Sequence, residues 1–251
     1  MALLKSKAQD YVRKEFNDLS EQDMSNKGLS GIWHGALGLN VTGANAVEFL
    51  QGYLTCNLDR LNHTSTVPMS LCNLKGRVIV SGWVYQHAPD HLELIVHESL
   101  TQKLSNVLAP YARFSRCDLE ISSEPPHVEV DQTTGVRFSR NGPDDDVGEQ
   151  VLRHLVESRF AWLTSETSER FLPQVLDLHN QGAVDFDKGC YLGQEIVARA
   201  QFRGSVKKEL VAFSWVGDSP EPGAENADGH IVISVTSSQD STNEGTGLAI
   251  A

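Results

Sequence analysis

Two glycines enclose a cysteine at residues 188–195, which read Lys-Gly-Cys-Tyr-Leu-Gly-Gln-Glu. Glycine adopts backbone conformations that other residues resist, so this stretch predicts a tight turn. Apolar residues with helical spacing follow, so we expect Cys190 to lie near the N-terminus of a helix. The helix dipole and the neighbouring Lys188 would both favour the thiolate form. The turn predicts a reactive cysteine; the alternative is a cysteine buried in a tight loop.

Length and cysteine content limit the class of protein. At 251 residues the chain can form one large domain or two small ones, with a core that needs no disulfides. The four cysteines (Cys56, Cys72, Cys117 and Cys190) show no C-x-x-C spacing, so the sequence gives no sign of a zinc ribbon or a thioredoxin-type site. Because this usage suits a reducing cytosol and no apolar run has bilayer length, we expect a cytoplasmic protein without membrane contact.

The charge of the chain is strongly negative overall but locally positive. A formal net charge of −12 argues against a general nucleic-acid-binding surface. Residues 188–209 nevertheless carry five basic residues against two acidic ones: Lys188, Arg199, Arg203, Lys207 and Lys208 against Glu195 and Glu209. A positive strip on an acidic protein suits a small anionic ligand or a phosphate contact. The alternative is a solvated helix face.

Hydrophobic periodicity predicts an α+β fold followed by a small all-β tail. Helices are expected at residues 44–51, 98–111, 147–158 and 191–202, with a weaker pattern at 8–16. Strands are expected at residues 37–41, 77–85, 92–97, 114–121, 210–216, 231–236 and 246–250, with two short ones within 128–138. Thr42 is the expected N-cap of the first of these helices, and Trp83, Trp162 and Trp215 are expected in the core. We place domain boundaries to give an N-terminal helical segment 1–30, a main domain 31–204 and a C-terminal domain 205–251.

Several segments together form a longer signature. Residues 171–179 read Phe-Leu-Pro-Gln-Val-Leu-Asp-Leu-His, and residues 188–199 continue the first motif through Ile-Val-Ala-Arg to a later Arg203-Gly204 pair. Weaker matches are the segment 41–57, which begins Val-Thr-Gly, and the segment 72–77, Cys-Asn-Leu-Lys-Gly-Arg. In this order and spacing, roughly from residue 30 to 216, the chain resembles the YgfZ family, folate-binding proteins related to the T-protein of glycine cleavage.

The resemblance implies a T-protein-like ring of α+β subdomains around a central channel that receives tetrahydrofolate, followed by a C-terminal β-barrel. It also implies a role in making or repairing iron–sulfur enzymes, including radical enzymes that thiolate transfer RNA. In the family the cysteine of the K-G-C motif is tied to function, and Cys190 stands at that position. Since the sequence ends at Ala251 in an apolar strand, we expect the barrel to be truncated, with an unpaired edge.

Two departures from the family pattern bear on activity. The glycine-cleavage relatives carry an aspartate in the strand after the Lys-Gly-type turn, whereas residues 78–82 here read Val-Ile-Val-Ser-Gly. Without that carboxylate, aminomethyl transfer lacks its main charged participant, so we expect an accessory factor rather than a high-turnover enzyme. Some members also place a tryptophan against the folate shortly before the Thr-Gly turn; Ala36 aligns there, with Trp33 three residues away.

Residues near Cys190 are the candidate folate ligands. Gln194 and Glu195 offer acceptors for the pteridine N–H groups, although Glu195 is equally explained as a first-turn helix residue. Arg199 and Arg203 are four apart, so a helix would place both on one face to bind the glutamate tail or to pair with surface carboxylates. Three further residues complete the set: Lys188, Gly189 and Tyr191, of which Tyr191 either packs under the turn or stacks on the ring.

No metal site is predicted. Asp185 and Asp187 would share one face of a strand, but His179 is their one nearby histidine and the chain has no H-E-x-x-H pattern.

Three functions stay open. The leading hypothesis is a tetrahydrofolate-binding accessory protein for iron–sulfur enzymes or their assembly machinery, with Cys190 as a redox or sulfur-handling thiol. The second is a folate-dependent one-carbon transferase or demethylase. The third is a tRNA-binding module that uses the basic strip, against which the net charge and the lack of interleaved aromatic residues argue.

Overall fold

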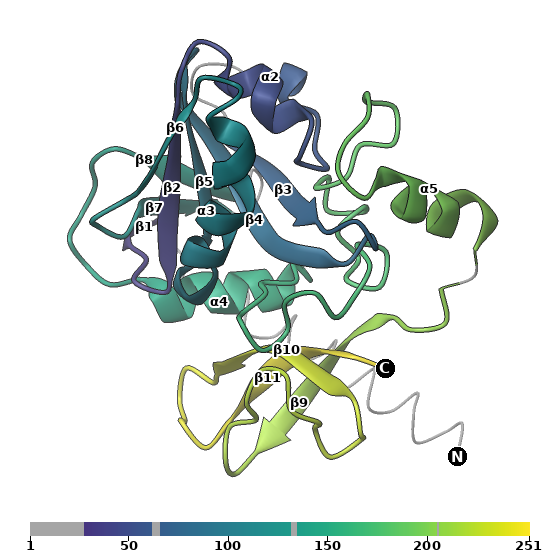
Figure 1. The fold of residues 1–251 in the computed structure, drawn as a ribbon. Coiled ribbons are helices and arrows are strands. Elements are labelled where there is room, and N and C mark those ends of the chain that lie inside the picture. The colour runs from purple at the N-terminus through teal and green to yellow at the C-terminus, as the bar shows by residue number, and fades with distance from the viewer. Residues whose placement is uncertain (1–27, 62–65, 132–134, 205) are drawn as a thin grey trace.

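Antiparallel sheets and the helices that cover them organise the chain (Figure 1). The computed structural model describes residues 28–61, 66–131, 135–204 and 206–251. The helix expected at residues 8–16 and most of the expected N-terminal segment 1–30 lie outside the described residues, as does residue 205 at the expected domain boundary. Among the described residues, no helix is both long enough and apolar enough to cross a membrane.

A five-stranded antiparallel sheet, with the strand order β3-β4-β5-β2-β6, forms the largest layer. Its strands are β2 (Ala36–Thr42), β3 (Thr66–Cys72), β4 (Val78–Ala88), β5 (His91–His97) and β6 (Asp118–Ile121). Helix α3 (Glu98–Ala112) covers one face and buries Leu100, Leu104 and Leu108, as the helical spacing predicts (Figure 1). A short helix, α2 (Ala46–Gln51), and a 3₁₀ turn, η1 (Leu58–Arg60), follow β2.

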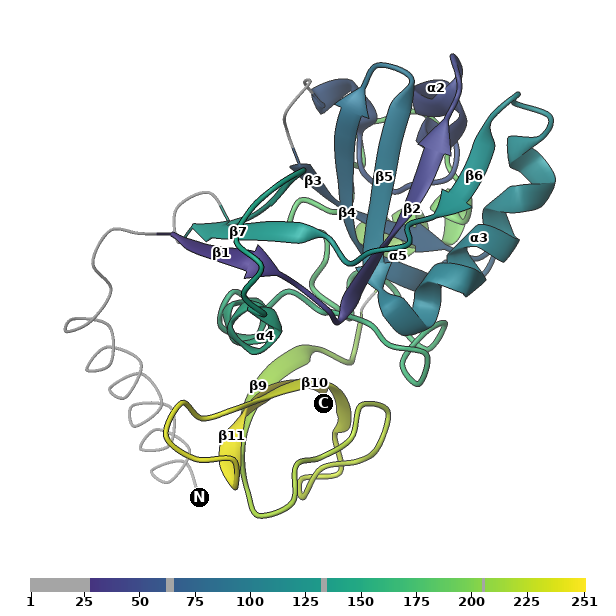
Figure 2. The same ribbon diagram turned by 90° about the vertical axis from the view of Figure 1, so that its left-hand side faces the viewer.

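Two three-stranded antiparallel sheets complete the fold. The first has the order β1-β7-β8, from β1 (Leu29–Ile32), β7 (His127–Asp131) and β8 (Gly135–Ser139). The second has the order β10-β11-β9, from β9 (Leu210–Val216), β10 (Ile231–Ser237) and β11 (Glu244–Ile250). Helix α4 (Gly148–Glu157) lies between this second sheet and the rest of the molecule (Figure 2). The expected C-terminal strands are present, and the sheet they form is not closed into a barrel in the described part of the chain.

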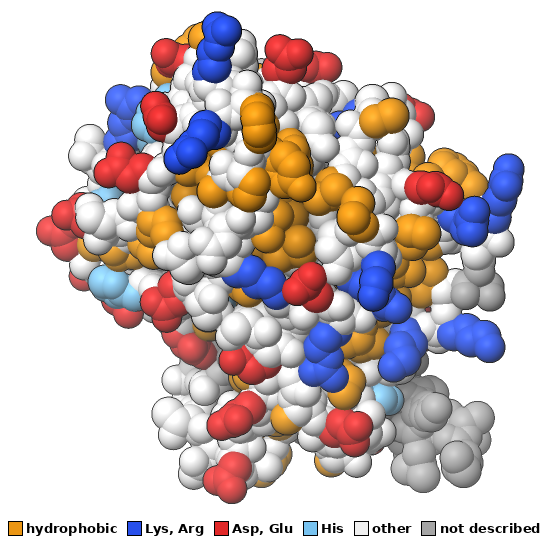
Figure 3. Space-filling view, in the orientation of Figure 1, with side chains coloured by type: hydrophobic (Ala, Val, Ile, Leu, Met, Phe, Trp, Pro, Cys, Tyr) orange, Lys and Arg blue, Asp and Glu red, His pale blue; other side chains and the backbone are white. Residues whose placement is uncertain are grey.

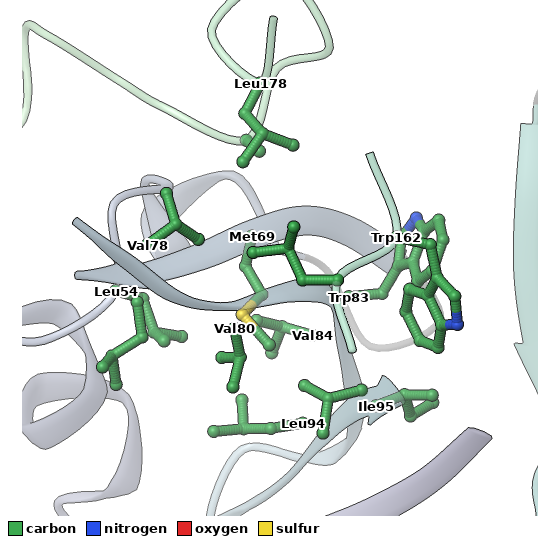
Figure 4. Packing of buried hydrophobic residues seen from close by; sticks show 14 of the residues in the cluster. Leu54, Met69, Val78, Val80, Trp83, Val84, Leu94, Ile95, Trp162 and Leu178 are labelled. Atoms are coloured by element: carbon green, nitrogen blue, oxygen red, sulfur yellow. The ribbon is translucent and has the colours of Figure 1, made fainter. Parts of the chain in front are cut away.

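An aromatic cluster joins the large sheet to its neighbours. The ring of Trp83 on β4 stacks on Phe160, which follows α4, with 4.5 Å between centroids, and lies 5.9 Å from Phe138 on β8. Trp162 lies beside Trp83 (Figure 4) and 4.6 Å from Trp33. All five side chains are buried, so the prediction that the tryptophans form core is confirmed here, and Trp33 has no exposed face for a ligand.

Two local predictions are wrong. Thr42 is not the N-cap of α2: Asn45 occupies that position, because the first helical hydrogen bond runs from the N–H of Phe49 to the carbonyl of Asn45, and its side chain makes no cap bond. The strand expected at residues 114–121 is limited to β6, because the residues directly after α3 form a hydrogen-bonded turn that ends the helix.

Candidate functional site

The signature segments, which are distant in sequence, meet at the start of α5 (Gln194–Arg203). The backbone N–H of Leu192 donates to the carbonyl of Gly52 at 3.1 Å, which joins residues 188–199 to the segment 41–57. The side-chain amide of Gln174 donates to the carbonyl of Val197 at 2.8 Å, which adds the segment 171–179. The signature therefore describes one spatial site and not a set of independent turns.

Gly193, the second glycine of the motif, packs against the remaining signature segment, residues 72–77. Gly193 has φ +81°, and a Cβ there would lie 2.4 Å from the carbonyl oxygen of Asn73, in the turn of residues 72–77. Gly189, by contrast, has an ordinary φ, and no atom lies within 4 Å of the place where its Cβ would be. The fold thus requires glycine at position 193, and leaves open space at position 189.

Lys188 anchors the motif to residues 51–56. Its Nζ donates to the carbonyls of Gln51 and Leu54 at 2.8 Å and of Cys56 at 2.7 Å, which uses all three ammonium hydrogens. Burial lowers the pKa of Lys188 from its usual value, and the nearby Cys56 and Asp185 oppose that change. The lysine is only 8% exposed and holds the loop onto the end of α2.

Asp185 makes a second anchor. Its carboxylate accepts from the backbone N–H of Asp187 at 2.8 Å and forms an ion pair with Arg60 at 2.6 Å, and its own N–H donates to the carbonyl of Thr55. Asp185 is buried whereas Asp187 is exposed, so the two carboxylates do not form a pair. Among the described residues, no group of three or more His, Cys, Asp or Glu side chains is arranged to hold a metal ion.

Cys190 follows these anchors and is exposed, unlike the three other cysteines, which are free and buried. The next residue turns inward: Tyr191 is 6% exposed, and the Nζ of Lys188 lies 5.5 Å from its ring centroid. Burial raises the pKa of Tyr191, and its hydroxyl is buried without a hydrogen-bond partner among the described residues. A packed tyrosine and a fixed lysine therefore support a thiol that faces solvent.

The outer face of α5 carries the other predicted ligands. Gln194 is half-buried, whereas Glu195, Arg199 and Arg203 are exposed. Arg199 and Glu195 form an i,i+4 ion pair at 3.5 Å, and no ion pair or hydrogen bond joins the guanidinium of Arg203 to another described residue. Lysine and arginine side chains gather on this side of the molecule, over α5 and the chain that follows it (Figure 3).

A hollow of about 150 Å³ opens elsewhere, between β3, β4, β8 and α4. Trp83 and Phe160 supply aromatic surface, and His154 and Gln181 supply polar groups. The hydroxyl of Thr66, which also lines the hollow, is buried without a partner in the described part of the chain. Burial lowers the pKa of His154, so its imidazole is neutral at pH 7 and offers one donor and one acceptor.

The implied cofactor, tetrahydrofolate, can be tested against these two places. The predicted ligands on α5 have suitable chemistry but do not line this hollow, and ligand sites usually bury most of their ligand. The hollow beside Trp83 offers polar groups in His154 and Thr66 that are unpaired among the described residues, whereas Trp83 and Phe160 stack on each other and present only their edges to a ring. A cavity of roughly 150 Å³ accommodates one benzene-sized ring, so it takes one ring of the bicyclic pterin and leaves the second ring and the tail outside.

The sequence analysis did not identify this hollow. Trp83 was predicted only as a core residue, and His154, Gln181 and Thr66 were not singled out. These residues come from four separate segments that carry no shared motif, so only the tertiary fold brings them together.

No family model matches the chain. Two curated relatives are the tRNA-modifying protein YgfZ of Yersinia pestis, 25% identical over 68% of this chain and 66% of that protein, and an uncharacterized Haemophilus influenzae protein, 26% identical over 70% of this chain and 69% of that one. The chain thus spans about two thirds of the length of these relatives.

A solved structure supports the same relationship. The glycine cleavage system aminomethyltransferase T from Bartonella henselae matches with a TM-score of 0.62 at 13% sequence identity, over 89% of this chain and 79% of that one. At this identity the match shows the fold alone. The chain is thus similar in sequence to YgfZ proteins and has the fold of the glycine cleavage T-protein.

Proposed function

We propose that this protein is a tetrahydrofolate-binding accessory factor for iron–sulfur enzymes, including enzymes that thiolate transfer RNA, with Cys190 as its functional thiol. One observation carries the proposal: an exposed cysteine stands on a loop that Lys188 and Asp185 fix in place. Burial of a charged ammonium group costs free energy, which its three hydrogen bonds to carbonyls must offset. Such an anchor is reasonable if the loop must present its sulfur in one position.

The folate would lie with one ring of its bicyclic pterin in the hollow beside Trp83 and the second ring at the mouth of the hollow. His154 and Gln181 would orient the ring through hydrogen bonds, and the free hydroxyl of Thr66 would gain a partner. When bound, tetrahydrofolate supplies a carrier for one-carbon units. The arginines of α5, above all the unpaired Arg203, stay candidates for the anionic tail.

Cys190 would act by thiol chemistry with a partner protein. An exposed thiol exchanges with disulfides or persulfides in proportion to its thiolate fraction and its access. All four cysteines are free, which fits the cytoplasmic location that we keep as part of the proposal. The division into domains 31–204 and 205–251 is likewise proposed, and the hydrogen bonds from Thr236 and Ser237 to the carboxylate of Glu149 on α4 would then link the two.

The one-carbon transferase is the second candidate, and the geometry gives it less support. None of the described residues that line the hollow is acidic, so no carboxylate replaces the aspartate of the glycine-cleavage relatives. Ser81, in the strand where that aspartate is expected, is fully buried and donates to the carbonyl of Ala161. A tRNA-binding strip over α5 is the third candidate. Binding of tRNA should then weaken as the salt concentration rises, and should also weaken when Arg199, Arg203, Lys207 or Lys208 is replaced.

The test is complementation of cells that lack the native protein. We expect the Cys190→Ala variant to accumulate and fold normally, because the side chain is exposed, yet to fail to restore tRNA thiolation and iron–sulfur enzyme activity. Ser219→Ala is the control, since it likewise removes one exposed side-chain heteroatom but lies outside the motif and both hollows. Full rescue by the Cys190→Ala variant would remove this thiol from the mechanism.

A further inference from the structure

We propose that the C-terminal end of α3 binds an unpaired nucleotide, through the guanidinium groups of Arg113 and Arg116 and the exposed ring of Phe114. This surface lies beside α2, at the upper end of α3 in Figure 1, and none of the predicted site residues belongs to it. The proposal goes beyond the accessory role above, since an accessory factor for tRNA-thiolating enzymes need not contact nucleic acid itself.

The first observation is an arginine in a conformation that favours glycine. The helix ends in a Schellman turn: the N–H of Cys117 donates to the carbonyl of Ala112 at 2.9 Å, and the N–H of Arg116 donates to that of Arg113 at 3.3 Å. Arg116 occupies the left-handed position of this turn, with φ +56°. Glycine is usual there because a Cβ is disfavoured in this region. A strained residue that the fold does not need is reason to look for a function.

The turn is fixed by contacts with the residues before α2. The side-chain amide of Asn45 donates to the carbonyl of Ser115 at 3.1 Å. Gly43 packs so closely that a Cβ there would lie 2.6 Å from the carbonyl oxygen of Arg116. The backbone that carries the two arginines is therefore held in one arrangement, which lowers the entropy lost on binding.

The second observation is the unused charge. Arg113 and Arg116 line a hollow of about 460 Å³ together with Asp118, the one acidic residue among its lining residues. Both arginine side chains are exposed, and no ion pair or hydrogen bond joins either guanidinium to another described residue. Two unpaired guanidinium forks at one hollow suit a phosphate, which Arg can bind in bidentate fashion.

The third observation is that two exposed aromatic residues neighbour these arginines in sequence, although neither lines the hollow itself. Phe114 is 88% exposed and Tyr111 is 48% exposed. The ring of Tyr111 lies 5.2 Å from that of Tyr53, which in turn lies 5.1 Å from Phe49, so a row of rings joins the end of α3 to α2. Aromatic rings stack on bases of any sequence. An acidic peptide would use the guanidinium groups and leave the rings bare, so the combination favours a nucleotide.

The experiment measures binding of a 5′-fluorescein-labelled, single-stranded RNA decamer to the full chain by fluorescence anisotropy at two salt concentrations. We expect Arg116→Gly to weaken binding about tenfold and also to raise the unfolding midpoint by about 2 °C, because glycine relieves the left-handed strain. Phe114→Ala should weaken binding by a similar factor through lost stacking. Arg137→Gln, which also removes one exposed arginine charge but lies outside both candidate surfaces, is the control and should leave binding within twofold of the parent.

Competition identifies the source of the nucleotide. If AMP displaces the decamer at concentrations near the affinity of the RNA, the site takes free mononucleotides; if only RNA competes, it takes a strand. Three results would overturn the proposal: no saturable binding up to 100 µM protein, equal weakening by Arg137→Gln, or displacement of the decamer by poly-glutamate as effectively as by unlabelled RNA. A lower unfolding midpoint for Arg116→Gly would also refute the reasoning, since the arginine would then serve the fold.

Discussion

Replacement of Lys188 by methionine tests whether this lysine anchors the motif. The change keeps a long flexible side chain and removes an ammonium that donates to three carbonyls, of Gln51, Leu54 and Cys56. A hydrogen bond to a charged group contributes roughly 1.5–3 kcal/mol, and a buried acceptor left without a partner costs about 1–3 kcal/mol. Because neighbouring terms are not additive and burial disfavours the charge, we expect a loss of about 3–5 kcal/mol.

That loss is a large share of the roughly 5–15 kcal/mol by which domains are usually stable. At this chain length each kcal/mol lowers the unfolding midpoint by about 2–4 °C, so Lys188→Met should unfold about 6–20 °C below the parent. Urea titration followed by circular dichroism measures the same difference, with the slope of the transition unchanged. Lys208→Met, which replaces an exposed lysine, is the control and should change stability by less than about 0.5 kcal/mol.

A small effect at Lys188 would refute the reasoning. If Lys188→Met lies within about 1 kcal/mol of the parent, water or backbone movement satisfies the three carbonyls and the lysine is not an anchor. If instead the variant is stable and only the reactivity of Cys190 changes, the lysine acts on the thiol, as the sequence suggested.

Three further predictions concern the same molecule. Gly193→Ala should destabilise the fold by about 2–4 kcal/mol, because the alanine would be left-handed and its Cβ would meet a carbonyl, whereas Gly189→Ala should be nearly neutral; thermal unfolding of the pair checks both. Cys190 should be the fast site for labelling by a maleimide, with Cys56 protected until unfolding because burial raises its pKa to about 12; mass spectrometry of a time course would contradict this if Cys56 reacts equally fast. Burial lowers the pKa of His154 below 6.5, so its contribution to stability is complete above that value and is lost as the pH falls through 6.5 to the lower folded pKa; unfolding midpoints from pH 7.5 to 5 should therefore fall less steeply for His154→Gln than for the parent.

Local sequence patterns predicted much of the fold. Leu100, Leu104 and Leu108 repeat at helical spacing and lie on the buried face of α3, and the apolar strands β4 and β5 form the expected hairpin. Two predictions at helix ends failed. The side-chain cap expected from Thr42 is absent at the start of α2, and after Ala112 a hydrogen-bonded turn occupies residues that had been assigned to a strand.

The candidate site was predictable only in part. The signature located the exposed thiol of Cys190, because a glycine-bounded turn before a helix is a local feature. The role of Lys188 was not predictable, since its three partners lie in a distant segment and lysines near turns are usually solvated. The hollow at His154 was missed for the same reason: long-range packing creates it, and no short motif encodes it.

Isothermal titration of the purified chain with tetrahydrofolate tests the account most directly. The account predicts saturable binding at one site, quenched tryptophan fluorescence from Trp83, and at least tenfold weaker binding for His154→Ala, with Lys208→Gln unchanged. Loss of binding in Glu195→Gln with His154→Ala unaffected would move the site to the surface of α5. Absence of any heat or fluorescence change up to millimolar folate would contradict the central claim.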